Sequence, residues 1–135
     1  MSEENVNILR EGYEEFNRGD IDAVTSIMDP NIEWQEPDVE GLPSGGTHHG
    51  PDAVVNDVFG PAVELWEDFG AVAEEFLDAG ERVVVLGRFQ GRGKESGRTL
   101  DAPFAHVWTL RDGKLVHHRN YTDTANHLQS LDKTA

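Results

Sequence analysis

The sequence predicts an α+β fold, a cone-shaped, curved antiparallel sheet packed on three N-terminal helices. Two observations support this fold class. In the first half of the chain apolar residues recur at helical spacing, whereas from Phe69 onward apolar and polar residues alternate as in strands. Helices that precede a run of strands are typical of α+β proteins, in which each layer buries its apolar face against the other. The length of 135 residues suits one domain, so we expect a single domain over residues 1–135.

Two helices are expected before residue 30. Gly19 ends the first helix, because glycine readily adopts the left-handed conformation of a helix C-terminus. Asp20 caps the second, shorter helix, and Pro30 ends it. The apolar face of the first helix consists of four residues at helical spacing, Val6, Leu9, Tyr13 and Phe16.

A short strand, a loop and a third helix follow. Residues 32–36 have the pattern of a strand, and the Gly-, Pro- and Ser-rich residues 38–50 predict a loop. Pro51 stands where a helix begins. We expect this helix to break at the Gly-Pro pair of residues 60–61 and to close with a last turn that contains Trp66.

Four strands and a last helix make up the rest of the chain. A polar, glycine-rich stretch over residues 91–97 predicts a loop, and Arg-Asp-Gly at 111–113 is a strong hairpin signal. Asp123 is expected to cap a helix that runs through Leu131. The expected strands are residues 69–79, 82–91, 98–110 and 114–122.

The charge balance is strongly acidic, with a formal net charge of -15. Such a charge repels phosphate backbones, so we expect no nucleic-acid partner. The excess of Asp and Glu over Lys favours a halophilic protein, in which salt screens the repulsion between carboxylates. An ordinary acidic protein is the alternative.

The composition also bears on the environment of the protein. There are no cysteines, so disulfides and thiolate metal sites are excluded. No apolar run approaches the ~20 residues that span a bilayer, and the acidic start Met-Ser-Glu-Glu is unlike a signal peptide. We therefore expect a cytoplasmic protein without a membrane partner.

Aromatic residues occupy positions that suit the wall of a cavity between helices and sheet. Phe104, His106 and Trp108 share one face of a strand, because alternate residues point the same way. Two aromatic rings around an imidazole favour that face as the interior. The candidates for ligand contact are Trp34, Phe59, Trp66, Phe89, Phe104 and Trp108, for which ordinary core packing is the alternative.

The hairpin register decides which residues of the last strand join this interior, since a shift of one residue reverses every side chain. A two-residue turn at 112–113 would pair Trp108 with His117, whereas a bulged three-residue turn would pair Trp108 with Val116. The bulged turn would place inside Val116, His118, Asn120 and Thr122. It would direct outward, toward a possible homodimer face, Leu115, His117, Arg119 and Tyr121.

Glu36 is the strongest candidate for a general base. It ends the short strand directly before a proline and a flexible loop, and a carboxylate among aromatic side chains has a raised pKa. A solvated strand-end glutamate is the alternative. In the bulged register His106 and His118 lie opposite each other, where imidazoles could shuttle protons or donate to a carbonyl oxygen. Two buried neutral histidines are the alternative there.

The same three side chains are suitable metal ligands, but their spacing in the sequence matches no metal motif. The adjacent histidine pairs at 48–49 and 117–118 would point to opposite faces of a strand. We therefore expect neither a metal ion nor a cofactor.

Several stretches taken together resemble one known family. They are Asn-Arg-Gly-Asp-Ile-Asp-Ala-Val at 17–24, Ile-Glu-Trp-Gln-Glu-Pro at 32–37, His-Gly-Pro-Asp-Ala-Val at 49–54, Phe-Ala-His-Val-Trp-Thr-Leu-Arg-Asp-Gly-Lys-Leu at 104–115 and Asn-Tyr-Thr-Asp at 120–123. In this order and spacing they resemble the SnoaL-like and ketosteroid isomerase-like branch of the nuclear transport factor 2-like superfamily. The resemblance covers nearly the whole chain and implies a cystatin-like cone, usually found as a dimer.

The resemblance also implies places for individual residues. In similar steroid isomerases the general base is an acidic residue before a proline after the first strand, which is the place of Glu36. Gly12 stands where those enzymes carry a tyrosine, with Tyr13 one residue away on a different face, and His106 stands at the place of their oxyanion-hole acid. Asn120 takes the place of an aspartate in related limonene-type epoxide hydrolases, and the parity of that strand in the family favours the bulged turn.

Two hypotheses for the function follow. The first is an enzyme of isomerase, cyclase or hydrolase type that performs cofactor-free acid–base chemistry on a small hydrophobic carbonyl or hydroxyl compound. In it Glu36 moves the proton, and the residues that polarise or orient an oxygen are His106, His118 and Asn120. The second hypothesis is a module of the same shape that binds a small ligand or dimerises without catalysis.

Overall fold

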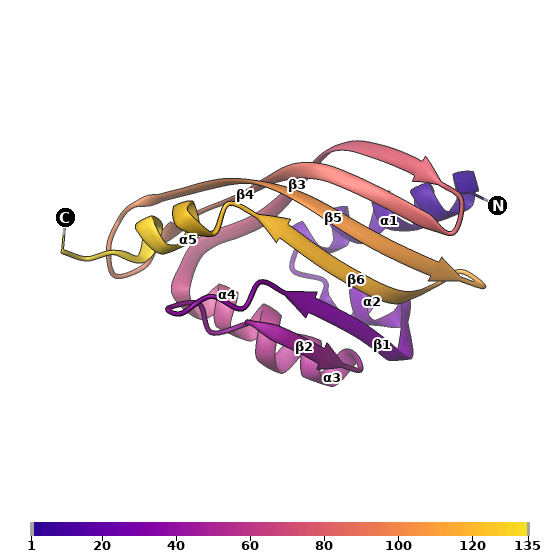
Figure 1. The fold of residues 1–135 in the computed structure, drawn as a ribbon, viewed down its shortest axis with the longest axis horizontal. Helices are drawn as coiled ribbons and strands as arrows, with labels where there is room; N and C mark the ends of the chain where they lie inside the picture. Colours follow the sequence, from indigo (N-terminus) through magenta and orange to yellow (C-terminus); the bar gives the residue numbers. More distant parts are fainter. Residues whose placement is uncertain (1, 135) are drawn as a thin grey trace.

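The structure, a computed structural model, describes residues 2–134 and combines helices with one strongly curved sheet (Figure 1). The helical segments are α1 (Ser2–Asn17), α2 (Ile21–Ser26), α3 (Pro51–Val54), the π-helical turn η1 (Val55–Phe59), α4 (Gly60–Leu65) and α5 (Thr124–Leu131). The strands are β1 (Met28–Glu36), β2 (Gly46–His49), β3 (Trp66–Ala79), β4 (Arg82–Gly93), β5 (Thr99–Arg111) and β6 (Lys114–Thr122). The predicted α+β class is confirmed. No helix within residues 2–134 has the length and apolar character needed to cross a bilayer.

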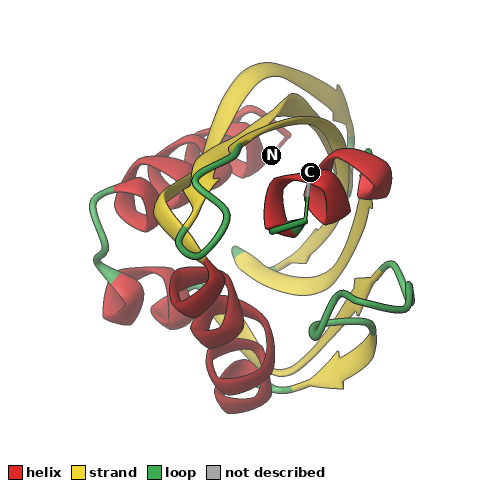
Figure 2. Ribbon diagram, turned by 90° about the vertical axis from the view of Figure 1, so that its left-hand side faces the viewer, coloured by secondary structure: helices red, strands yellow, loops and turns green. Residues whose placement is uncertain are grey.

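The six strands form one sheet in the order β2-β1-β6-β5-β4-β3. Neighbouring strands are antiparallel except β1 and β6, which run parallel. The sequence predicted an antiparallel sheet, and this one pair differs from that prediction. β1 adds to the β6 edge of the β3–β6 meander. The strands curl around α5 at one end, and α1 to α4 lie along one side of the curl (Figure 2).

The first edge of the sheet differs from the prediction. β1 begins at Met28 rather than at residue 32, because α2 ends at Ser26, and Pro30 lies inside the strand. Residues 46–49, predicted as part of a loop, form β2 and pair with β1. These four residues alternate between half-buried and exposed and include no large apolar side chain, so the sequence carried no strand signal there.

The third helical region continues through the Gly-Pro pair at residues 60–61, where a break is predicted. In η1 the N–H of Gly60 donates to the carbonyl of Val55, five residues earlier. This wider turn makes room for Pro61, whose ring would clash with the preceding turn of a regular α-helix. The helix ends at Leu65, and Trp66 begins β3 instead of closing the helix.

The remaining elements lie close to their predicted positions. β6 has the predicted bounds, and α5 ends at Leu131 as predicted. Asp20 and Asp123 cap α2 and α5, each by accepting a hydrogen bond from a backbone N–H three residues ahead. β4 extends to Gly93, so the loop predicted over residues 91–97 is shorter than expected.

The β5–β6 hairpin decides which side chains of β6 face the core. Residues 112–113 have positive φ values of 52° and 77°, as in a two-residue type I′ turn. A bulge then shifts the register of the two strands. As a result Trp108 lies opposite His118 and His106 lies opposite Asn120, so neither pairing predicted for Trp108 is right.

The bulge falls at Val116, the extra residue between two consecutive pairs of the ladder. Leu115 is buried and Val116 is half-buried, the reverse of the predicted orientation. Beyond the bulge the parity agrees with the prediction, because His118 and Asn120 are buried and Tyr121 is exposed. A tight turn followed by one extra residue thus has the same effect on parity as the predicted bulged turn.

Gly87 in β4 is packed tightly between β3 and β5, where it pairs with Ala73 and Phe104. A Cβ atom at Gly87 would meet the carbonyl oxygen of Val72 and the ring of Phe104, the latter at 2.7 Å. We expect Gly87→Ala to lower the free energy of unfolding by about 1–3 kcal/mol, because backbone and packed ring cannot both move away. Gly12→Ala in α1 is the matched control, since its Cβ would meet only the end of the Ile27 side chain at 3.2 Å and alanine is the better helix former. Urea unfolding of both variants is the measurement, and a Gly87→Ala protein as stable as wild type would contradict the close approach.

Candidate functional site

A cavity of about 130 Å³ lies between the sheet and the helices. Side chains from α1, β1, η1, the long strands and α5 line it, together with the loop over residues 42–45, and most of them are apolar. An apolar cavity of ~150 Å³ binds benzene, so this volume suits a compound with one ring. An apolar wall with a few converging polar groups is the usual form of a small-molecule site.

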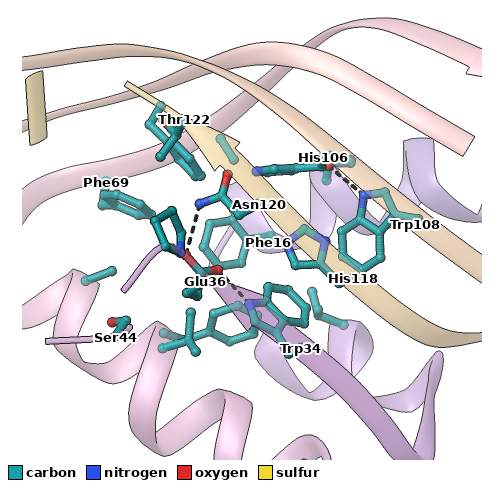
Figure 3. A pocket seen from close by; sticks show the side chains of 18 of the residues that line it. Phe16, Trp34, Glu36, Ser44, Phe69, His106, Trp108, His118, Asn120 and Thr122 are labelled. Atoms are coloured by element: carbon teal, nitrogen blue, oxygen red, sulfur yellow. Dashed lines mark hydrogen bonds between the residues drawn. The ribbon is translucent and has the colours of Figure 1, made fainter. Parts of the chain in front are cut away.

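Glu36 places a carboxylate in this cavity (Figure 3). One of its oxygens accepts a hydrogen bond from Nε1 of Trp34 at 2.6 Å, and the other accepts from Nδ2 of Asn120 at 2.9 Å. Burial raises the pKa of Glu36, and the two hydrogen bonds partly oppose this shift because they favour the anion. The carboxylate is therefore oriented by two donors and is more basic than a glutamate in water.

A buried chain of hydrogen bonds orients His106. Nε1 of Trp108 donates to the hydroxyl of Tyr13 at 2.9 Å, and this hydroxyl lies 2.6 Å from Nδ1 of His106. Because Trp108 already donates to Tyr13, we place the phenolic proton on the side of Nδ1, which assigns the ring proton of His106 to Nε2. Burial raises the pKa of Tyr13 and lowers the pKa of His106 to about 3. His106 is thus neutral at pH 7 and carries its proton on Nε2.

His118 lies between two tryptophan rings. Its ring centroid is 3.9 Å from that of Trp34 and 4.1 Å from that of Trp108. Burial, with a further contribution from the nearby imidazole of His106, holds the pKa of His118 well below its usual range. His118 is therefore a neutral ring with one donor and one acceptor nitrogen.

The structure brings the predicted polar residues together. Glu36, His106, His118 and Asn120 all line the one cavity. Five predicted aromatic residues line it as well, namely Trp34, Phe59, Trp66, Phe89 and Trp108. Phe104 does not line it but packs behind His106, with ring centroids 3.8 Å apart, because Gly87 opposite it leaves room for the ring.

Tyr13 and His127 also line the cavity, and neither was predicted as a site residue. The expectation that Tyr13 lies on a different face is wrong, since its hydroxyl contacts His106 and Trp108. The helical spacing of Leu9, Tyr13 and Phe16 correctly predicted Tyr13 on the apolar face of the first helix, but gave no sign that its hydroxyl reaches His106. His127 reaches the cavity from α5 and lies 3.2 Å from the hydroxyl of Thr122, a contact with no local sequence signal.

Within residues 2–134 no three His, Asp or Glu side chains lie together in a way that could hold a metal ion. The cavity contains a carboxylate, an N–H donor and an amide close together.

A family model described as the SnoaL-like domain matches residues 9–118. The chain belongs to this family. The matched region includes Tyr13, Glu36, His106 and His118, and Asn120 lies just beyond it. Among curated proteins no match was found.

Solved structures confirm the nuclear transport factor 2-like fold of this SnoaL-like protein. An NTF2-like protein of unknown function from Burkholderia pseudomallei K96243 is 32% identical over 100% of both chains, with a TM-score of 0.88. An NTF2-like protein from Burkholderia thailandensis E264 is 32% identical over 93% of this chain and 95% of that chain, with a TM-score of 0.85. TerC, co-crystallised with polyporic acid, is 28% identical over 95% of this chain and 98% of that chain, with a TM-score of 0.85.

Proposed function

We propose that this SnoaL-like protein is an enzyme that performs cofactor-free acid–base chemistry on a small hydrophobic compound with a carbonyl or hydroxyl group. The observation that supports it most is the carboxylate of Glu36, which is held by two donors in an apolar cavity and has a raised pKa. A base with a pKa nearer to neutral pH is more effective in proton transfer from carbon.

In the proposed reaction Glu36 removes a proton from the carbon next to the substrate carbonyl. The electron pair of the C–H bond forms the C=C bond of an enolate, and the π pair of the carbonyl moves onto its oxygen. Nε2–H of neutral His106 donates to that oxygen, as preorganised donors do where negative charge develops. Protonated Glu36 then returns the proton to the same or another carbon, so the reaction needs no oxidant, reductant or cofactor.

One relative was crystallised with a small organic compound. TerC was co-crystallised with polyporic acid. In the present chain the rings of Trp34, Phe59 and Trp108 would contact the apolar part of such a ligand.

The test is hydrogen–deuterium exchange at the carbon next to the carbonyl in a panel of small cyclic ketones, followed by NMR in heavy water. We expect the purified protein to accelerate exchange in at least one ketone over a buffer blank. The exchange rate should rise with pH, because only the ionised carboxylate of Glu36 can take a proton. Since burial raises the pKa of Glu36, this rise should occur at a pH above 4.5, the ordinary pKa of a glutamate. If ketones bind but none exchanges hydrogen faster than in the buffer blank, the proposed catalysis is wrong.

The alternative is a non-catalytic ligand-binding module, and one observation favours it. Both oxygens of Glu36 already accept hydrogen bonds, which is also the arrangement of a carboxylate with a purely structural role. A ligand that copurifies with the protein and is released unchanged on denaturation, together with no exchange in the ketone panel, would select this alternative.

We also propose a homodimer through the outer face of the sheet. Tyr121 and Val72 expose 49% and 40% of their surface there, and the guanidinium of Arg119 lies 4.9 Å from the centre of the Tyr121 ring. Burial of such apolar surface favours association. Sedimentation at micromolar concentration should give a dimer, and Tyr121→Glu should shift it toward monomer; a wild-type monomer would contradict the proposal.

A further inference from the structure

Four buried polar atoms of the cavity have no hydrogen-bond partner within residues 2–134. They are Nε2 of His106, both ring nitrogens of His118, and Oδ1 of Asn120. The three residues are only 4%, 1% and 6% exposed, and all of them line the cavity (Figure 3). Buried polar atoms in proteins almost always have partners, because leaving them without one destabilises the fold. These atoms therefore indicate where the polar groups of a ligand bind.

The surrounding hydrogen bonds assign a role to each atom. Nε2 of His106 is a donor, because Nδ1 of that ring faces the hydroxyl of Tyr13. Oδ1 of Asn120 is an acceptor, because its Nδ2 donates to Glu36, and the reversed amide would set two acceptor oxygens against each other. Neutral His118 adds one donor and one acceptor. The cavity thus presents two donors and two acceptors.

The four atoms form two neighbouring pairs. His106 and Asn120 are paired residues on the neighbouring strands β5 and β6, and both side chains line the cavity. A ligand hydroxyl could accept from Nε2–H of His106 and donate to Oδ1 of Asn120. The ring of His118, with its centroid 4.8 Å from that of His106, offers the same two functions to a second oxygen beside the first.

We propose that the cavity binds a compound with oxygens on two neighbouring carbons, and that the substrate is an α-hydroxy carbonyl compound which reacts through its enediol. This inference rests on the proposed function, since Glu36 supplies the base. Glu36 takes the proton from the carbon that carries the hydroxyl, the C–H electron pair forms a C=C bond, and the carbonyl π pair moves onto oxygen. Transfer of that proton from Glu36 to the oxygen gives the enediol, and reversal at the other carbon exchanges the carbonyl and hydroxyl positions.

The enediol matches the cavity better than a simple ketone does. Its two hydroxyls supply two donors and two acceptors, which serve all four partnerless atoms of the three residues. A ketone oxygen only accepts, so it would leave Oδ1 of Asn120 and one nitrogen of His118 without partners. A reaction is accelerated by interactions that are stronger in the transition state than in the ground state, and the transition state of this reaction resembles the enediol.

Catechol tests this inference, because its adjacent hydroxyls on a flat ring imitate an enediol and one ring suits a cavity of about 130 Å³. Isothermal titration calorimetry of the full chain, with a reductant present, compares catechol with resorcinol and phenol. We expect catechol to bind at least about tenfold more tightly than either, because only its hydroxyls can serve both pairs of atoms. Equal affinities of catechol and resorcinol would overturn the proposal.

His118→Phe provides a second, independent measurement. The new ring keeps the place between Trp34 and Trp108 but removes two partnerless atoms, so we expect the ligand-free variant to melt at a higher temperature than wild type. The ratio of phenol to catechol dissociation constants should fall from about ten to about one, while phenol still binds. His49→Phe, at an exposed histidine of β2, is the matched control and should keep the wild-type ratio. A His118→Phe protein that keeps the preference for catechol would overturn the proposal.

This outcome can be separated from that of the proposed function, because catechol binding needs no turnover. A catechol preference without hydrogen exchange in any ketone or α-hydroxy ketone would support the two-oxygen site and overturn both the proposed catalysis and the enediol reaction. Hydrogen exchange in simple ketones without a catechol preference would support the enzyme and overturn the two-oxygen site.

Discussion

Replacement of Glu36 by glutamine is expected to slow hydrogen exchange next to the substrate carbonyl by about 10²–10⁴-fold, the usual contribution of a general base. Glutamine has nearly the same shape as glutamate, so the cavity keeps its form, but the amide cannot take up the proton. Because glutamine offers a single acceptor oxygen, either Trp34 or Asn120 loses its present partner. Thermal melting of the variant should accompany the kinetics, so that a folding defect is recognised.

Glu33→Gln is the matched control for this experiment. Glu33 belongs to the same strand, but its carboxylate lies beside His49 and His117 at 3.5 and 3.3 Å, outside the cavity. The substitution removes the same charge, and we expect the exchange rate to stay within about twofold of wild type. Equal losses in Glu33→Gln and Glu36→Gln would point to a general effect of charge and contradict the role of Glu36 as base.

Acidification from pH 7 to pH 4 is expected to destabilise the fold through its buried histidines. Burial lowers the pKa of His106 to about 3 and that of His127 to about 4, from an ordinary value of 6.5. Between these values the unfolded chain binds protons that the folded chain does not, so the free energy of unfolding falls as the pH falls. At about 1.4 kcal/mol per pKa unit, His106 alone accounts for about 3 kcal/mol between pH 6.5 and pH 4. Glu36 acts in the opposite direction, because its pKa is raised on folding.

Urea unfolding at pH 7 and pH 4 measures this effect in wild type and in His106→Phe. Phenylalanine keeps a ring on Phe104, where the centroids of the present pair are 3.8 Å apart, but it cannot titrate. The loss of stability between the two pH values should be about 3 kcal/mol smaller in the variant than in wild type. His49→Phe, at an exposed histidine, should show the wild-type loss. An unchanged pH dependence in His106→Phe would show that His106 titrates normally in the folded chain.

The elements that sequence reasoning placed correctly have signals within a few neighbouring residues. The apolar spacing along α1, the capping aspartates Asp20 and Asp123 and the turn at 112–113 all act over one or two turns of chain. The polar residues of the cavity were found for a related reason, since His106 and Trp108 share a face by strand periodicity and Glu36 ends a strand before a proline.

By itself, then, the sequence determined the α+β class, the order of most elements and the polar side chains that the structure brings into one cavity. Only the tertiary structure decided the bulge at Val116, the pairing of β2 with β1 and the contact between Tyr13 and His106. The physical reason is the distance along the chain. Tyr13 and His106 are 93 positions apart, and the burial and hydrogen bonds that orient them exist only when helix and sheet have packed together, which no local pattern of residues encodes.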